Sequence, residues 1–378
     1  MILKMYDYFN IDIDYAKGIY IYSKEGEKYI DTFSGIGVLS FGHSNENLIN
    51  AMKNKMQRYM HLSNFFLDED VEWVANKLIE FTDKNGAVFF TNSGTESTEA
   101  ALKAIKKIST KEKNKIIYFK KGFHGRTLGA LSINGFEKLK SPFRPLLPYC
   151  KEFEFNDVDG FNDYMKYHGD EIIAVFVEAI QGSGGVMELT KEFSEILNKY
   201  HNEKNFILVC DEVQAGLGRT GKFFSYEHFN LKPDIITVGK SLGGGLPLGA
   251  TIFLNDTTNI LKPGDHGSTF APNPVALAGA RYMLDNLPNM LDDVFEKGNY
   301  LKNKLESMKT YKIADIRGKG LMIGIELDEP YPDLRESAFK RGLLLNIISN
   351  NSVIRLLPAL NISYDEIDEI IKILEELL

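Results

Sequence analysis

The chain has 378 residues, of which 44% are hydrophobic and 25% charged, so its length predicts two or three domains around a sizeable core. Its formal net charge of -8 argues against a nucleic-acid-binding or anionic-membrane-binding protein. The two cysteines, Cys150 and Cys210, form no CxxC motif, and the first residues lack the apolar core of a signal peptide. We therefore expect a cytoplasmic protein with no membrane-spanning segment.

The hydrophobic pattern divides the chain into three regions. Residues 1–45 contain "GIYIYSKEGEKYIDTFSG", which predicts a hairpin that packs with the end of the chain. In residues 46–285, short apolar runs alternate with helix-like stretches, a pattern typical of a mostly parallel α/β sheet flanked by helices. Residues 286–378 read as helices and short strands, which predict a smaller α+β domain. The two chain ends together would build this small domain.

The segment "FFTNSGTESTEAALKAI" begins as an apolar strand, passes through small residues and continues as a helix. Ser93, Gly94 and Thr95 stand where this helix begins. Free backbone N–H groups, two hydroxyls and the positive end of the helix dipole favour a phosphate there. The alternative is a simple N-cap from Ser93 or Thr95. The two are compatible, because a phosphate site also needs a formed helix start.

The glycine-flanked segment "KKGFHGRTLGALS" carries three candidate residues. Phe123 is either a core residue or a ring that stacks on a flat ligand. Arg126 is either a solvated charge or a fork for a carboxylate. His124 is a candidate catalytic base, although a packed or backbone-bonded histidine is the more common case.

Charged residues stand at the ends of two apolar strands. Asp211 ends "FILVCD", where a carboxylate can bind a metal, orient a base or pair with a cationic heterocycle. Lys240 follows the apolar run 235–238 in "DIITVGKSLGGGLPLGA", either as a surface lysine or as one used for its amine chemistry. In an open α/β sheet, ligands bind outside the carboxyl ends of the strands.

Two nucleotide-binding patterns occur without the context that they need. The "GKS" at 239–241 would belong to a P-loop, but Asp234 stands where GxxxxGK[ST] requires glycine. The "GLGRTG" at 216–221 has the GxGxxG spacing, but residues 211–215 separate it from its strand, and no clear amphipathic helix follows. We therefore expect neither an ATPase nor a nicotinamide-dependent dehydrogenase, and we expect 216–221 to be a loop.

Two later segments add polar candidates. Ser268 and Thr269 lie in "HGSTFAPNP", which reads either as a plain turn or as a binding loop. Arg355 lies within the apolar "VIRLLPAL". An arginine inside an apolar strand needs a partner, which is either another residue or an anionic substrate.

Together these motifs describe a site for pyridoxal phosphate. The cofactor needs a phosphate cradle, a stacking ring, a carboxylate beside the ring nitrogen and a lysine that forms a Schiff base with its aldehyde. The carboxylate keeps the ring protonated, so that the ring can accept electrons from the substrate carbanion. No metal site is expected.

The motifs also carry a specific resemblance. "SGTES", "FHGRTLGALS", "DEVQAGLGRTGKFFSYEHF", "VGKSLGGGLPLGA", "HGSTF" and "RGKGLMIGIEL" occur in this order. The chain resembles the class III, fold-type I pyridoxal-phosphate aminotransferases, and among them the acetylornithine aminotransferases, from about Gly18 to Pro358. The resemblance makes Lys240 the Schiff-base lysine.

The resemblance implies the other roles. Gly94 and Thr95 would hold the phosphate with Ser93 adjacent. The ring of the cofactor would meet Phe123 on its face, Asp211 at its nitrogen and Gln214 at its hydroxyl. A homodimer with shared sites is implied, in which Ser268 and Thr269 enter the partner's site and Thr269 contacts its phosphate. The residues expected to bind substrate are Arg126, Glu178, Ser268 and Arg355.

The implied reaction moves an amino group from an ω-amino acid, N2-acetylornithine first, to 2-oxoglutarate. Its products are N-acetylglutamate 5-semialdehyde and glutamate, as in arginine biosynthesis. Alternative donors are ornithine, 4-aminobutyrate, succinylornithine, acyl-lysine or diaminopimelate. A related epimerase or mutase would also use Lys240. A non-catalytic cofactor-binding protein is a further alternative, but it would not need to keep the lysine, the aspartate, the arginine and the phosphate cradle.

The sequence departs from the family at "VEAIQGSGGV". Glu178 is retained, but Ala179 replaces a proline, and Ser183 replaces the glutamate that in the family pairs with the arginine matching Arg355. Serine cannot neutralise a guanidinium, so we expect an altered switch between ω-amine and α-amino acid substrates. Phe65 and Phe66 stand where family members often have tyrosine, which also affects the substrate pocket.

Overall fold

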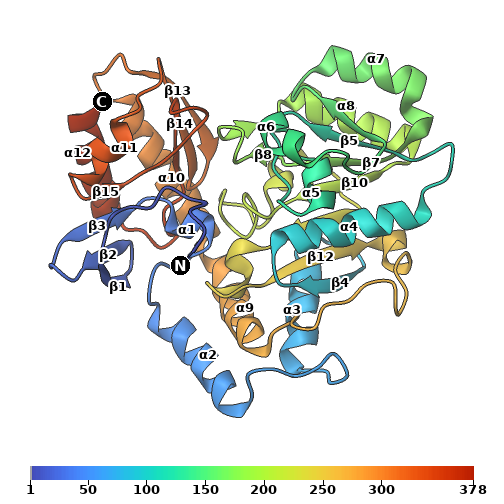
Figure 1. Ribbon diagram of the computed structural model, residues 1–378, viewed down its shortest axis with the longest axis horizontal. Coiled ribbons are helices and arrows are strands. Elements are labelled where there is room, and N and C mark those ends of the chain that lie inside the picture. The colour runs from blue at the N-terminus through green and yellow to red at the C-terminus, as the bar shows by residue number, and fades with distance from the viewer. Residues whose placement is uncertain (1) are drawn as a thin grey trace.

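The structure is a computed structural model that describes residues 2–378 (Figure 1). Its centre is a seven-stranded sheet. Strand β12 runs antiparallel to both of its neighbours, and the other pairs are parallel, which confirms the mostly parallel sheet expected from the sequence. In spatial order the strands are β4 (Gly86–Thr91), β12 (Gly249–Leu254), β11 (Ile235–Val238), β10 (Ile207–Asp211), β7 (Ile172–Val177), β5 (Lys115–Phe119) and β6 (Cys150–Phe153).

Helices flank this sheet because their apolar faces match its buried strands. Every residue of β7 and of β12 is buried, as expected for strands covered on both faces. The long helix α4 packs on β11 and β12 with small side chains (Figure 1). The helices of this part are α2 (Glu46–Arg58), α3 (Glu69–Glu80), α4 (Gly94–Ile108), α5 (Leu128–Ser132), α6 (Glu137–Lys140), α7 (Val158–His168), α8 (Lys191–Lys204) and α9 (Pro274–Asn286), whereas the short α1 (Ser34–Gly37) lies beside the N-terminal strands (Figure 1).

The two chain ends share a second region of the molecule. Strand β15 (Leu343–Leu344) joins the N-terminal strands β1 (Ile13–Lys17), β2 (Tyr20–Ser23) and β3 (Lys28–Asp31) by pairing in parallel with β3. An antiparallel sheet lies beside them, with strands β13 (Ile313–Lys319), β14 (Met322–Leu327), β17 (Val353–Leu356) and β16 (Asn346–Ile348). Its helices are α10 (Leu291–Glu306), α11 (Leu334–Phe339) and α12 (Tyr364–Leu377).

Figure 1 shows the blue and red ends of the chain side by side, as the sequence pattern predicts. The domain boundaries expected at residues 45 and 285 stay a prediction. Among residues 2–378, no helix has both the length and the apolar character that crossing a membrane requires.

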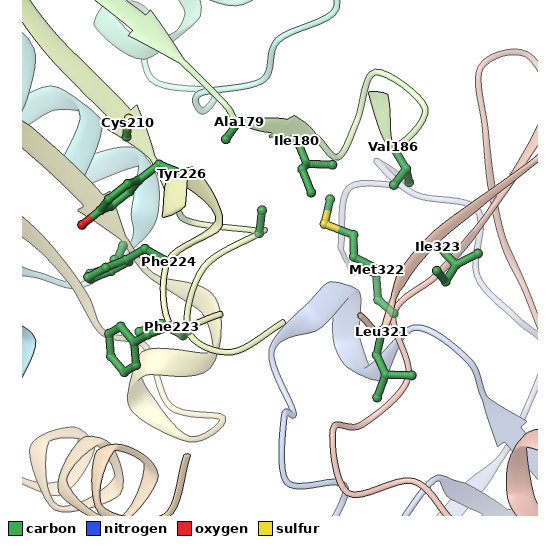
Figure 2. Packing of buried hydrophobic residues seen from close by; sticks show 14 of the residues in the cluster. Ala179, Ile180, Val186, Cys210, Phe223, Phe224, Tyr226, Leu321, Met322 and Ile323 are labelled. Atoms are coloured by element: carbon green, nitrogen blue, oxygen red, sulfur yellow. The ribbon is translucent and has the colours of Figure 1, made fainter. Parts of the chain in front are cut away.

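A short hairpin fastens the large sheet to the C-terminal sheet. Its strands are β8 (Ile180–Gln181) and β9 (Met187–Glu188), and they enclose Ser183. Figure 2 shows Met322 of β14 reaching toward Ile180, with Val186 and Ile323 nearby, and all four side chains belong to one buried apolar cluster. This packing fixes the turn that carries Ser183 against the sheet that carries Arg355.

The GxGxxG segment is a loop, as expected. Residues 216–221 form consecutive turns rather than a helix start. Arg219 is buried there, and its Nη1 donates to the backbone carbonyls of Leu321 and Pro358. Arg219 therefore fastens the loop 216–221 to the C-terminal region, so the glycine-rich segment has a structural role.

Candidate active site

A cavity of about 290 Å³ opens at the carboxyl ends of five strands of the large sheet. Each of β4, β5, β7, β10 and β11 ends beside it, as the general rule for open α/β sheets requires. Its volume is near the lower bound for pockets that hold small organic molecules. It is lined by Ser93, Gly94, Thr95, Phe123, His124, Gly125, Arg126, Glu178, Ser183, Asp211, Val213, Gln214 and Lys240.

The start of α4 supplies unpaired donors to this cavity. Ser93 is the N-cap, and its side chain accepts the Glu96 N–H at 3.3 Å. The N–H groups of Gly94 and Thr95 lie in the first turn, where no intrahelical acceptor exists. The N-cap is therefore confirmed, and the phosphate site stays a prediction that the cap does not oppose, because two donors still face the cavity at the positive end of the helix.

Glycines bring the walls of the cavity close together. A Cβ on Gly94 would lie 2.5 Å from Val213 Cγ1, and a Cβ on Gly125 would lie 2.0 Å from Thr95 Oγ1. Gly125 also has φ of +135°, a conformation that side chains disfavour. Both positions therefore require glycine. The cradle they leave, with backbone donors and one hydroxyl, fits a phosphate group.

Asp211 and His124 form a buried pair on the floor of the site. His124 Nδ1 lies 2.7 Å from Asp211 Oδ2, and the Val213 N–H donates to Oδ1 at 3.1 Å. Burial alone would lower the pKa of His124, but the hydrogen bond and charge of Asp211 outweigh it and raise that pKa. The pair keeps one carboxylate oriented in the cavity. The sequence left His124 open as either a catalytic base or a packed or backbone-bonded histidine, and gave no indication of this contact.

Lys240 begins a 3₁₀ turn (Lys240–Gly243) directly after β11. Its φ of +46° is left-handed, which costs free energy for a residue with a side chain. Burial lowers the pKa of Lys240 to about 8, Asp211 opposes this shift, and Arg355 adds to it. The amine is therefore far more often neutral and nucleophilic near pH 7 than an ordinary lysine.

Glu178 and Phe123 also line the cavity. The Phe123 N–H donates to Glu178 Oε2 at 2.8 Å. Burial raises the pKa of Glu178 to about 7, and His124 works against that shift. Arg126 is exposed at the rim, with its guanidinium carbon 5.5 Å from the centre of the Phe123 ring. An anion that reaches the rim can therefore bind Arg126 without a large desolvation cost.

Arg355 reaches the site through a neighbour. It is buried on β17, and its Nη1 donates to Gln214 Oε1 at 2.9 Å. Gln214 itself lines the cavity.

The structure thus brings together all the expected residues except two. Ser268 and Thr269 lie in a partly exposed loop outside the cavity, where Ser268 Oγ accepts from Asn92.

Comparisons with known proteins agree with this geometry. The family model described as aminotransferase class-III matches residues 2–378. The acetylornithine aminotransferase of Aquifex aeolicus is 41% identical over 96% of both chains, and that of Bacillus subtilis is 40% identical over 99% of this chain and 97% of its own.

Solved structures show the same fold. The ornithine aminotransferase of Toxoplasma gondii superposes with a TM-score of 0.92 at 28% identity, covering 99% of this chain and 91% of its own. The N-acetylornithine aminotransferase of Stenotrophomonas maltophilia superposes with a TM-score of 0.83 at 27% identity, covering 97% and 95%. The chain therefore belongs to the class-III aminotransferases, which are pyridoxal-phosphate-dependent enzymes of fold type I.

Proposed function

We propose that the protein transfers the ω-amino group of N2-acetylornithine to 2-oxoglutarate, giving N-acetylglutamate 5-semialdehyde and glutamate. This step belongs to arginine biosynthesis. Relatives of about 40% identity over nearly the whole chain carry the name acetylornithine aminotransferase. The observation that carries the proposal is the single cavity that joins Lys240 and Asp211 to the unpaired donors of α4, with Arg126 at its rim.

The cavity residues fit pyridoxal phosphate. When bound, this group supplies an aldehyde that takes up an amino group and a protonated ring that accepts electron density. Gly94 and Thr95 would hold the phosphate, with Ser93 beside them, and Phe123 would cover one face of the ring. Asp211, oriented by His124, would keep the ring nitrogen protonated.

Lys240 and the polar groups around it would act on the substrate. The amine of Lys240, with its lowered pKa, would take a proton from the substrate carbon that bears the amino group and deliver it to the carbon that had carried the aldehyde of the cofactor. In the second half of the reaction it would move a proton in the opposite direction. Gln214 would bind the ring hydroxyl. Arg126 and Arg355 would bind the two carboxylates of 2-oxoglutarate, and Glu178 would lie beside the substrate between them.

The assembly proposed is a homodimer with shared sites. Ser268 and Thr269 lie outside their own chain's cavity, and the loop that carries them exposes Phe270 at 64%. In the dimer this loop would enter the partner's site, with Thr269 at the phosphate. A cytoplasmic location fits the two free cysteines.

A panel of amino donors tests the substrate. Each donor is supplied with 2-oxoglutarate to the holoenzyme, and glutamate formation is measured. N2-acetylornithine is expected to give the highest kcat/KM among acetylornithine, succinylornithine, ornithine, 4-aminobutyrate and acylated lysine or diaminopimelate. A higher value for another donor would assign the enzyme to that donor instead.

Arg126→Ala is expected to raise KM for carboxylate substrates and leave the absorbance of the bound cofactor unchanged. The loss of a charge-assisted bidentate contact costs roughly 1.5–3 kcal/mol, or about tenfold to a hundredfold in binding. Steady-state kinetics measures it. Arg144→Ala is the control, because Arg144 is an exposed arginine paired with Glu137 outside the cavity. Unchanged KM in Arg126→Ala would exclude Arg126 from substrate binding.

Mixing two inactive or weakened variants tests site sharing. Lys240→Ala chains and Thr269→Ala chains are mixed to form heterodimers. If sites are shared, one site of each heterodimer carries both substitutions, and the other has native Lys240 and native Thr269. Activity is then expected to rise on mixing above the mean of the two parents. If the subunits are shown to exchange and activity does not rise, Thr269 acts in the site of its own chain.

A further inference from the structure

Arg355 is held by two side-chain amides. Its partner across the antiparallel pair β16–β17 is Asn346, whose Oδ1 accepts from Nε at 3.0 Å and from Nη2 at 2.8 Å. Gln214 Oε1 accepts from Nη1 at 2.9 Å. All these acceptors are neutral oxygens, so the guanidinium is oriented without being neutralised.

No carboxylate among residues 2–378 lies within ion-pair distance of this guanidinium. Burial lowers the pKa of Arg355 to about 10, and the charge of Glu178 opposes that shift from farther away. A buried cation without an anionic partner is costly. The site therefore gains most from a ligand that brings its own negative charge.

The turn that carries Ser183 passes beside this arginine. A Cβ on Gly324 would lie 2.9 Å from Val186 Cβ and 3.0 Å from Gly185 O, and Gly324 is the register partner of Arg355 on β14. A glutamate at 183 would be carried by this same turn, but the serine there makes no hydrogen bond to Arg355 in the described chain. Asn346 and Gln214 therefore bind Arg355 through neutral oxygens, and the turn that carries Ser183 adds no carboxylate to it.

The geometry also fixes which donors remain for a ligand. A guanidinium has five N–H groups, and three of them bond Asn346 and Gln214. One N–H is left on each of Nη1 and Nη2. Both are available to a carboxylate, to which a guanidinium donates strong charge-assisted hydrogen bonds.

We propose that Asn346 is a specificity-determining positioning residue. By binding the side edge of Arg355 with a neutral oxygen, it leaves the guanidinium charged and its two remaining N–H groups available to substrates that carry a carboxylate on the reacting carbon, such as glutamate and 2-oxoglutarate. Such a substrate does not have to displace a protein carboxylate from Arg355. The inference rests on the proposed transamination and names a residue of its glutamate half-reaction.

The test is Asn346→Asp, which keeps the shape of the side chain and adds the missing charge. Each half-reaction is followed on the holoenzyme through the cofactor absorbance, with glutamate alone or N2-acetylornithine alone. We expect kcat/KM for glutamate to fall about tenfold to a hundredfold, the effect of losing a charge-assisted contact. The value for acetylornithine, whose reacting carbon bears no carboxylate, is expected to stay or rise.

Asn350→Asp is the matched control. It makes the same change four positions later, on the connection between β16 and β17, but Asn350 is exposed, so the ratio of the two half-reactions is expected to be that of the wild type. Glutarate and butyrate provide a readout without chemistry. Titration calorimetry is expected to show weaker binding of glutarate to Asn346→Asp, with butyrate unchanged.

Equal losses in both half-reactions, or an unchanged glutamate value, would overturn the proposal. If Asn346→Asp does not yield folded holoenzyme, Asn346→Ala decides, because the unheld arginine is expected to lose only the glutamate half-reaction. If acetylornithine is not a substrate of the wild type, the ω-amine that replaces it in the donor panel serves for the ratio. The substrate assignment then fails while the role of Asn346 is still tested.

Discussion

Lys240→Ala is expected to abolish transamination while the protein still binds pyridoxal phosphate. Lys240 is the one lysine among the described residues that line the cavity. Without it, no lysine amine lines the cavity in the described chain to move the proton. Removal of an acid–base group alone costs about 10²–10⁴-fold in rate. Glutamate formation measures the loss, and the cofactor is expected to stay bound through the start of α4 and Phe123.

The covalent link gives an independent readout. Borohydride is expected to bleach the yellow band of the wild type and to fix the mass of the cofactor on the peptide that contains Lys240. Lys232→Ala, an exposed lysine a few residues upstream, serves as the control and is expected to keep full activity. A reduced adduct on any other lysine would contradict the assignment.

Asp211→Ala is expected to lower kcat by about 10²–10³-fold, the size of effect seen when one preorganised electrostatic group is removed. The carboxylate that keeps the ring nitrogen protonated is lost, and His124 loses its partner. KM for carboxylate substrates is expected to change little, because Asp211 does not face them. The contrast with Arg126→Ala, which should act on KM, is measured by steady-state kinetics of both variants.

Glu212→Gln provides the matched control for Asp211. Glu212 is the next carboxyl group along the chain, but it accepts hydrogen bonds from Ser225 and Tyr226 and does not line the cavity. Burial raises the pKa of Glu212 to about 8, so an amide resembles its protonated form. Activity is expected to persist. A larger loss of kcat in Glu212→Gln than in Asp211→Ala would reverse the two roles.

Much of this site could be predicted from local sequence because each residue stands at a strand end. The apolar runs before Asp211 and Lys240 predict buried strands, and parallel strands bring their carboxyl ends to one edge. Ser93 could also be predicted as an N-cap, since a small polar residue before an amphipathic run predicts a helix start. The positions of Ser93, Asp211 and Lys240 along the chain were therefore enough to place these residues in the cavity.

Contacts that depend on strand register could not be predicted in this way. Asn346 meets Arg355 because β16 and β17 pair with one particular alignment, and a shift of one residue would turn the amide to the other face. The bond between His124 and Asp211 joins positions 87 residues apart. Nothing in either local segment indicates that the two side chains point at each other.

Because β15 pairs with β3, the N-terminal sheet cannot be completed until the end of the chain has been synthesised. Thr32 Oγ1 donates to the carbonyl of Leu344, across 312 positions of sequence. A ribosome adds about 5–20 residues per second, so the N-terminal strands wait roughly 15 to 60 seconds for the strand that completes their sheet. During that interval the edge of β3 is open to other chains. The large sheet, whose strands all lie between positions 86 and 254, can close first and hold the waiting hairpin near the place where the last strand arrives.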